Sequence, residues 1–393
     1  MGFDRRGRAR TPRRPTERRF GHNGTGPATE MTPFAFIVHP IDARRDVARK
    51  FPVARYLPLG VIERFLKRKR AFVVSEIRGV RSETGAGAKG WFIGCGLTPR
   101  MIRNLPVEFV YDKIVACCEV GAEQGAKIVG LGAFTAVVGD AGVTINKRSP
   151  VPVTTGNSYT VATAIEGTLE AARLMEIDPE QATLAVVGAT GSIGRTCALI
   201  LAPKFARTLL IGRDPERTRR IAEEIGGEPS TDVADLRQAD VVITVTSAAT
   251  AIIRPEHLKP GAVVCDVARP RDVSRRVVAD RDDVLVIEGG VVEVPGDVEF
   301  GFDFGFPPRM AYACMAETMM LALDGRAEPF TVGKEVSVQQ VEEIQAVAKR
   351  HGFRLAGFRS FERPVSNETI RRVCEAARRT RGREARKEAA VEG

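Results

Sequence analysis

Three glycines that follow a short apolar run are the residues of this chain with the clearest chemical meaning. Thr183 to Gly194 reads T-L-A-V-V-G-A-T-G-S-I-G. Gly188 permits a tight turn after a strand, Gly191 lets the backbone approach a pyrophosphate, and Gly194 lets the next helix lie close to the strand. The free N–H groups and the dipole of that helix attract an anion. The pattern predicts a dinucleotide site with these contact residues: Gly188, Thr190, Gly191, Ser192, Ile193, Gly194, Thr246 and Gly289.

The next predicted strand, Arg207 to Gly212, indicates which dinucleotide binds. An NAD site usually carries an acidic residue about 20 positions past the first glycine. Here the strand ends at Gly212 and is followed by Arg213 and Arg217. Two guanidinium groups four residues apart suit a 2′-phosphate. We therefore expect NADPH, bound by Arg213 and Arg217; the alternative for these arginines is a solvated basic helix face.

Composition and charge set the broad class of the protein. The chain has 393 residues, of which 44% are apolar and 27% charged, which allows two domains with proper cores. Seven scattered cysteines without a C-x-x-C pair favour reduced thiols and a cytoplasmic location, and argue against a metal site. No apolar run is long enough to cross a membrane.

The net charge of +10 is concentrated at the two ends of the chain. Residues 1–33 carry +5 and residues 371–393 carry +4, so the remainder is near neutral. Neither end has interleaved aromatic residues of the kind that stack on bases, so we expect no specific nucleic acid. We expect residues 1–33 to be disordered and residues 357–393 to form a basic tail with a frayed polar helix.

Alternating strand and helix patterns predict an α/β fold with a Rossmann-type doubly wound dinucleotide domain and an N-terminal α/β substrate domain. Early strands are predicted at Phe34 to His39, Ala71 to Arg78 and Ala126 to Leu131. Later ones are predicted at Thr183 to Val187, Arg207 to Gly212, Ala239 to Val245, Ala262 to Val267 and Val284 to Glu288. The expected division is 34–158 for the substrate domain, 159–306 for the dinucleotide domain, 307–356 for C-terminal helices and 357–393 for the tail.

Two apolar patterns follow the last predicted strand. Phe300, Phe302, Phe304 and Phe306 recur at every second position, so in an extended chain their rings share one face. They are either core packing or an apolar wall for a long hydrophobic substrate. Arg309 to Leu323 then predicts an apolar helix with Cys314 in its middle, where a cysteine is usually a small buried hydrophobe.

Most of residues 32–354 resembles the long-chain fatty acyl-(acyl-carrier-protein) reductase family known from cyanobacteria. The blocks that carry the resemblance are the strand ending in His39, G-L-G-A-F-T at 130–135, T-T-G-N-S at 154–158, V-G-A-T-G-S-I-G at 187–194, G-G-V-V-E at 289–293, A-C-M-A-E at 313–317 and H-G-F at 351–353. The chain departs from the family in both tails, in the Phe/Gly run and in C-D-V-A-R-P at 265–270. Because family members begin near the first strand, residues 1–30 are expected to precede the true start at Met31.

The resemblance implies the chemistry. In that family the cysteine of the A-C-x-A-E block is the acylated nucleophile, which implies this role for Cys314, with Glu317 in the same block. The implied reaction is NADPH-dependent reduction of an acyl thioester to a fatty aldehyde. His39 and Lys113 are the matched positions that can activate the thiol, and backbone N–H groups near 154–158 or 289–290 can hold an oxyanion. Structural alternatives stay open for each: a hydrogen-bonded strand-end histidine, a solvated lysine and a hinge turn.

The implied partner is an acyl-carrier-protein or coenzyme A thioester, followed by a downstream enzyme that takes the aldehyde. Because the carrier protein is acidic, the basic cluster Arg64, Lys67, Arg68, Lys69 and Arg70 is its expected docking site, or else a solvated helix face. Other functions also fit parts of the sequence. These are a shikimate-dehydrogenase-like oxidoreductase acting on a small polar substrate, glutamyl-tRNA-reductase-like chemistry, and a non-catalytic NADP-binding protein.

Overall fold

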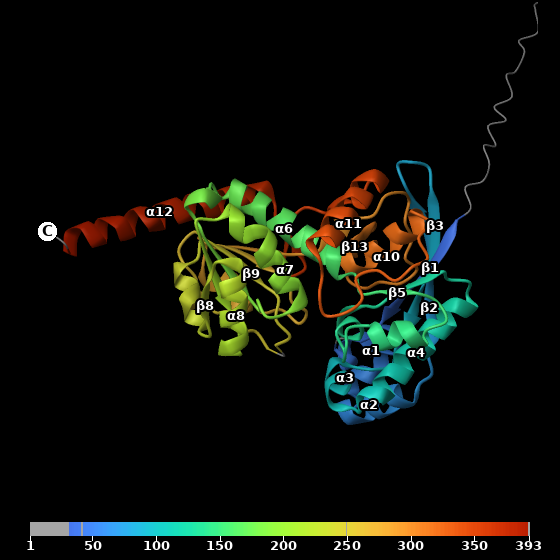
Figure 1. The fold of residues 1–393 in the computed structure, drawn as a ribbon. Helices are drawn as coiled ribbons and strands as arrows, with labels where there is room; N and C mark the ends of the chain where they lie inside the picture. The colour runs from blue at the N-terminus through green and yellow to red at the C-terminus, as the bar shows by residue number, and fades with distance from the viewer. Residues whose placement is uncertain (1–30, 41, 249, 392–393) are drawn as a thin grey trace, which may run out of the picture.

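The computed structural model describes residues 31–40, 42–248 and 250–391, and these residues form two lobes, each built on a β-sheet (Figure 1). The predicted α/β class with a Rossmann-type domain is confirmed by the strand order and by the parallel pairing described below. Most of the segment expected to be disordered, residues 1–30, lies outside the described residues.

The first sheet has the order β2-β3-β1-β4-β5. Its strands are β1 Thr32–Val38, β2 Phe72–Arg81, β3 Gly87–Gly94, β4 Ile128–Gly130 and β5 Val153–Thr154. Alternate residues of β1 enter two different cores. Phe34 and Phe36 pack toward helix α10 (Ala313–Leu323), and Ala35 and Ile37 pack toward helix α4 (Val107–Glu123). The strand is apolar at successive positions because both of its faces are covered.

Two strands of this sheet, β3 and the short β5, have no counterpart among the predicted strands. Strand β3 runs antiparallel to β2 and parallel to β1. Its sequence, G-A-K-G-W-F-I-G, is rich in glycine, which is uncommon in strands. Here two of these glycines give room to aromatic rings: a Cβ at Gly90 would lie 2.5 Å from Phe34, and one at Gly94 would lie 2.7 Å from Phe72.

The second sheet is parallel throughout, with the order β11-β10-β9-β6-β7-β8. Its strands are β6 Thr183–Val187, β7 Arg207–Ile211, β8 Glu228–Ser230, β9 Val241–Thr244, β10 Val263–Asp266 and β11 Leu285–Glu288. The chain leaves β6 toward β7 on one side and returns to β9 on the other, so β6 and β9 flank the switch point where such sheets bind ligands. Helices α7 (Ser192–Leu201) and α8 (Pro215–Ile225) follow β6 and β7.

A single long helix joins the two lobes. Helix α6 (Asn157–Leu174) begins just after β5 and packs on β9, β10 and β11 of the second sheet. Its N-terminal half contacts α10, and α11 (Val338–His351) lies along it. The remaining helices are short: α1 Ala43–Lys50, α2 Leu59–Arg68, α3 Pro99–Asn104, α5 Val143–Arg148 and α9 Arg275–Asp280.

Two predicted elements near the C-terminus are corrected by the structure. Residues 309–323 do not form one helix, because Met310–Tyr312 is a strand, β13, that pairs with β12 (Val291–Glu293), and α10 starts only at Ala313. Strand β14 (Arg354–Leu355) pairs with the other edge of β12. The Phe/Gly run at 300–306 is a series of bends, with positive φ at Gly301 and Gly305, and is not a strand.

Residues 357–393, expected to be a basic tail, are also ordered over most of their length. A hairpin of β15 (Arg359–Ser360) and β16 (Arg363–Pro364) contacts β11. It leads into helix α12 (Asn367–Val391), which buries Ile370, Cys374 and Ala377. The helix continues past the second lobe in Figure 1. Its first turns belong to the folded core, which the overall charge of the segment did not indicate.

Candidate active site

One cavity of about 970 Å³ collects residues that follow strands of both sheets. From the second sheet it is lined by Gly188, Thr246 and Gly289, which follow β6, β9 and β11. From the first it is lined by His39 after β1 and by Cys95 after β3. The carboxyl ends of parallel strands are where α/β proteins bind ligands, and here two such edges share one space.

The glycine turn after β6 has the geometry that the sequence predicts. Gly188 has φ +84°, and a Cβ there would lie 2.7 Å from the Val245 carbonyl oxygen. A Cβ at Gly194 would lie 2.3 Å from the Gly188 carbonyl oxygen, so this glycine allows α7 to approach the strand and is not itself a lining residue. A Cβ at Gly191 would lie 3.3 Å from the Gly188 carbonyl oxygen, which is a tight contact. Thr190, Gly191, Ser192 and Ile193 all line the cavity.

The start of α7 offers unused hydrogen-bond donors. Gly191 supplies no side-chain cap, and the Ser192 hydroxyl is buried without a hydrogen-bond partner among the described residues. Free N–H groups, a helix dipole and an unpaired hydroxyl at one point fit a pyrophosphate. The residues present therefore fit a dinucleotide of the NAD(P)H type.

At the end of β7 the carboxylate of Asp214 is already engaged. Asp214 Oδ1 accepts a hydrogen bond from the Arg217 backbone N–H at 3.0 Å and caps α8, so it is not directed at a ribose. Arg213 and Arg217 are exposed and line the cavity, and Arg217 Nη2 donates to the Thr190 carbonyl at 3.3 Å. The edge of the site therefore presents two positive charges.

A buried aspartate that the sequence did not single out fixes the wall near Thr246. Asp272 is fully buried and accepts hydrogen bonds from the Thr246 N–H at 2.8 Å, the Thr246 hydroxyl at 2.6 Å and the Thr244 hydroxyl at 2.6 Å. Because Asp272 lies in an irregular segment between β10 and α9, neither periodicity nor a motif marks it.

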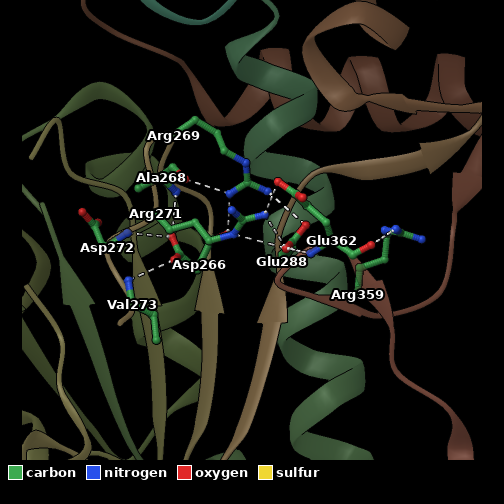
Figure 2. Close-up of polar contacts among 9 residues, drawn as sticks. All are labelled: Asp266, Ala268, Arg269, Arg271, Asp272, Val273, Glu288, Arg359 and Glu362. Atoms are coloured by element: carbon green, nitrogen blue, oxygen red, sulfur yellow. Dashed lines mark hydrogen bonds and ion pairs between the residues drawn. The ribbon is translucent and has the colours of Figure 1, made fainter. Parts of the chain in front are cut away.

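A cluster of arginines and carboxylates forms another part of the wall (Figure 2). Glu288, at the end of β11, accepts hydrogen bonds from Arg269 Nη2 at 3.4 Å, Arg271 Nη2 at 2.8 Å and the Glu362 N–H at 2.7 Å. Arg269 and Glu362 line the cavity. The guanidinium of Arg269, in the 265–270 segment, therefore forms part of the cavity wall.

The neighbouring carboxylate, Asp266, is satisfied by backbone groups. It accepts from the N–H groups of Ala268 at 3.1 Å and Val273 at 3.0 Å (Figure 2). Burial raises the pKa of Asp266 to about 6, and the charge of Arg269 opposes this rise. Asp266 therefore shapes the turn that carries Arg269.

Cys314 lines the cavity and is the second residue of α10. The sequence predicts it in the middle of a helix instead. The difference arises because β13 takes up the three preceding residues. The turn 154–158 packs directly on it: a Cβ at Gly156, where φ is +75°, would lie 2.3 Å from the Cys314 Cα. Only glycine fits there, which gives the T-T-G-N-S block a steric reason. The Ala313 N–H donates to the Gly290 carbonyl at 2.8 Å, which ties this helix start to the second sheet.

The surroundings of the sulfur decide its protonation. Burial, together with the charge of Glu317, raises the pKa of Cys314 to about 12. Backbone hydrogen bonds from Met315, Cys314 and Ala133 act in the opposite direction. The thiol is therefore protonated in the free protein, and N–H groups already converge beside it. Such groups can hold negative charge on a substrate oxygen.

Glu317, expected in the active site, lies behind it. Its buried carboxylate accepts from the Ser158 hydroxyl at 2.6 Å, the Tyr159 N–H at 2.9 Å and the Thr331 hydroxyl at 3.0 Å, and also from the Thr154 hydroxyl. It does not line the cavity. Glu317 thus joins α10 to the 154–158 turn, which is a positioning role.

The two residues expected to activate the thiol occupy different places. His39 lines the cavity, and burial lowers its pKa to about 4, so the ring is neutral. Its Nε2 accepts from the Phe134 N–H at 3.2 Å, which holds the loop that contains Ala133, and its Nδ1 lies 3.3 Å from the carbonyl oxygen of the adjacent Pro40. Lys113 is not among the lining residues, since its Nζ donates to the Lys69 carbonyl at 3.0 Å.

Beyond Cys314 the cavity continues into an apolar arm. Its walls are Phe36, Val38, Leu66, Phe72, Val74, Phe302 and Phe304. Phe304 stands between two other rings, 5.1 Å from Phe300 and 5.6 Å from Phe92 between centroids. In the Phe/Gly run Phe300 is thus buried in the core, while Phe302, Phe304 and Phe306 line the cavity.

No helix among the described residues is long and apolar enough to cross a membrane, and these residues contain no group of three or more side chains suited to hold a metal ion.

Comparisons with known proteins agree with this architecture. Residues 170–288 match the family described as shikimate / quinate 5-dehydrogenase, which covers the dinucleotide lobe only. Over 270 residues the chain is 33% identical to aminotransferase PigE of a Serratia species, an alignment of 66% of this chain and 32% of that protein. It therefore spans about a third of that relative. It is also 29% identical to the long-chain acyl-[acyl-carrier-protein] reductase of Synechococcus elongatus over 81% of this chain and 98% of that one.

Two further similarities concern rival functions. A glutamyl-tRNA reductase of Sorangium cellulosum is 29% identical over 121 residues, which is 28% of this chain and 22% of that protein. The solved shikimate 5-dehydrogenase of Thermus thermophilus is 16% identical, with a TM-score of 0.36 over 66% of this chain and 86% of that one. Together with the site, the comparisons identify an oxidoreductase-type fold that binds an NAD(P)H-type dinucleotide, with distant similarity to acyl-[acyl-carrier-protein] reductase.

Proposed function

We propose that this protein reduces a long-chain fatty acyl thioester to the fatty aldehyde with NADPH, through an acyl group held on Cys314. The observation that carries the proposal is the continuity of the cavity, which runs from the glycine turn past Cys314 into the apolar arm. A thiol between a dinucleotide site and an apolar channel suits a substrate with a reactive carbonyl at one end and a hydrocarbon chain at the other.

In the first step the Cys314 sulfur attacks the thioester carbonyl carbon, forming one C–S bond while the donor C–S bond breaks. Because the pKa of Cys314 is raised, its proton must leave as the bond forms, and the departing donor sulfur takes up one proton. The backbone N–H groups around Ala133 and Met315 are positioned to stabilise negative charge on the carbonyl oxygen. Glu317 and His39 hold the two loops that carry this geometry.

NADPH, when bound, supplies the hydride that reduces the acyl carbon. The resulting thiohemiacetal on Cys314 then breaks its C–S bond, which releases the aldehyde and returns the thiol after uptake of a proton. Arg213 and Arg217 favour NADPH over NADH because they offer charge to a 2′-phosphate and because Asp214 is engaged as a helix cap. The acyl donor is a thioester of acyl-carrier protein or coenzyme A, in keeping with the reductase similarity that spans nearly the whole relative.

The experiment is to incubate the protein with a long-chain acyl thioester without NADPH and to measure the mass of its peptides. We expect one acyl group on the peptide that contains Cys314, and its release as aldehyde when NADPH is added. Cys95 also lines the cavity, so Cys95→Ser is the matched control and should still be acylated. An equal adduct on Cys314→Ser protein refutes the assignment. Full activity of Cys314→Ala on a small polar hydroxy acid would instead favour the shikimate-dehydrogenase-like alternative.

A further inference from the structure

The outer surface around α1 and α2 exposes an unusual number of large apolar side chains. We call this surface the 51–65 face, and its apolar members are Phe51, Val53, Tyr56, Leu57, Leu59, Val61 and Phe65. They are 37 to 80% exposed, and they make up seven of the twelve exposed large hydrophobic residues among the described part of the chain. A concentration of this kind in fifteen residues marks a surface that contacts another apolar phase.

The same surface is strongly basic. Arg44, Arg45, Arg55, Arg64, Lys67, Arg68 and Arg70 are exposed on or beside it. Of the nearby acids, Glu63 is buried and paired with Arg100, so it does not offset these charges at the surface. Apolar and aromatic side chains surrounded by Lys and Arg are the composition of segments that lie in the interface of an anionic bilayer.

The 51–65 face also meets the cavity. Phe51 and Phe65 are 45% and 58% exposed, yet both line the cavity beside Leu66 and Phe72 of the apolar arm. The arm therefore ends beneath the exposed apolar residues. In Figure 1, α2 lies at the tip of the first lobe, on the far side from α12, so neither the second lobe nor α12 covers it.

We propose that the 51–65 face binds the surface of an anionic lipid bilayer, with its apolar side chains among the acyl chains and its arginines at the headgroups. An acidic carrier protein would use the same positive charges, but charge alone gives no reason for seven apolar side chains on the surface. The use of this contact, which rests on the proposed function, is to pass a water-insoluble aldehyde into lipid.

The test is vesicle flotation of the full chain, which needs no enzymatic activity. The protein should float with vesicles of equal phosphatidylglycerol and phosphatidylcholine. With vesicles of phosphatidylcholine alone, its partition coefficient into the vesicle fraction should be lower by about tenfold or more. Val53→Ser should weaken binding about fivefold. Arg64→Glu with Arg68→Glu should weaken it by about tenfold or more. None of these three residues lines the cavity, so the melting temperature should be unchanged, as should acylation of Cys314 by an acyl-coenzyme A donor, which needs no docking of a carrier protein.

Matched control variants distinguish binding by the 51–65 face from nonspecific adsorption of the protein to vesicles. Val278→Ser on α9, 45% exposed, and Arg371→Glu with Arg372→Glu on α12 should float like the wild type. Failure of the wild type to float, or equal flotation of all variants, overturns the proposal. So does loss of carrier-protein affinity in the α2 charge variant without any effect on flotation, because the face then belongs to a protein partner. Self-association that Val53→Ser abolishes, again without an effect on flotation, would assign the face to a second copy. The proposed function is judged separately, by the Cys314 adduct.

Discussion

At its dinucleotide end the cavity is lined by the turn from β6 into α7 and by short segments that follow β7, β9 and β11 of the same sheet, whereas its cysteine end depends on contacts among segments as distant as His39, Gly156 and Thr331. The first arrangement depends on backbone geometry that neighbouring residues impose on each other. The second depends on side chains that must meet after the whole chain has folded. We therefore expect substitutions at the cysteine end to cost more stability and more activity than substitutions at the dinucleotide end.

The largest effect is expected for Gly156→Ala. A Cβ would lie 2.3 Å from the Cys314 Cα, and the positive φ adds strain, so the loss of stability should be on the order of 3 kcal/mol or more, with acylation nearly abolished. Gly226→Ala is the matched control, because Gly226 has φ +78° but nothing within 4 Å. It should cost about 1–2 kcal/mol of strain and leave acylation intact. Urea unfolding measures the stability of the two variants, and adduct formation measures their acylation. Equal losses of stability in Gly156→Ala and Gly226→Ala would contradict the steric explanation.

Glu317→Gln tests the hydrogen bonds that join α10 to the 154–158 turn behind Cys314. The carboxylate accepts from four donors, and an amide that presents its own N–H groups to them should cost about 2–4 kcal/mol of stability. Acylation of Cys314 should slow while NADPH affinity stays unchanged, as measured by fluorescence titration. A parallel loss of NADPH affinity would mean that the two ends of the cavity are not independent.

His39 predicts a pH effect at the same end. Its pKa is 6.5 in the unfolded chain and about 4 when folded, so the unfolded state binds more protons between these values. The stability that neutral His39 contributes is present above pH 6.5 and is lost as the pH falls toward 4, by up to about 3 kcal/mol. His39→Gln keeps an acceptor for the Phe134 N–H but does not titrate. Urea unfolding at pH 7 and 4.5 should show a smaller acid loss in the variant, and identical losses refute the assignment.

The smallest effect is expected at the dinucleotide end. Arg213→Ala with Arg217→Ala should weaken NADPH binding by about 1.5–3 kcal/mol in total, because both side chains are exposed and partly screened. NADH binding, acylation of Cys314 and stability should hardly change. Arg219→Ala, on the same helix but not lining the cavity, is the control. Equal weakening of both dinucleotides would exclude a 2′-phosphate contact.

The same contrast explains what the sequence could predict. Apolar runs locate β6, β7, β9, β10 and β11 to within about two residues, because a doubly covered parallel strand is apolar at every position. The glycine turn and the two arginines are likewise local patterns. Strand β3 has no such pattern, because its glycines leave room for aromatic rings of the neighbouring strands β1 and β2.

At the cysteine end the sequence identified Cys314 and the 154–158 block by resemblance, but not their roles in space. The start of α10 depends on the pairing of β13 with a strand some 20 residues earlier, which no helical periodicity reveals. Elsewhere in the cavity wall, Asp272 and Arg269 lie in irregular chain and are fixed by contacts with Thr246 and Glu288. For the same reason Lys113 was expected near Cys314, although its amine is held at the Lys69 carbonyl.

Helix α6 has a mechanical consequence. Its eighteen residues span about 27 Å, with one end beside Gly156 and Cys314 and its length packed on β9 and β10. Because α6 packs against both lobes, the distance from the Cys314 thiol to the carboxyl edge of the second sheet is set by a continuous helix and not by a flexible hinge. A hinge opening of the two lobes would require α6 to bend. In the proposed reaction the spacing between the thiol and the dinucleotide site is therefore set by the fold of the free protein.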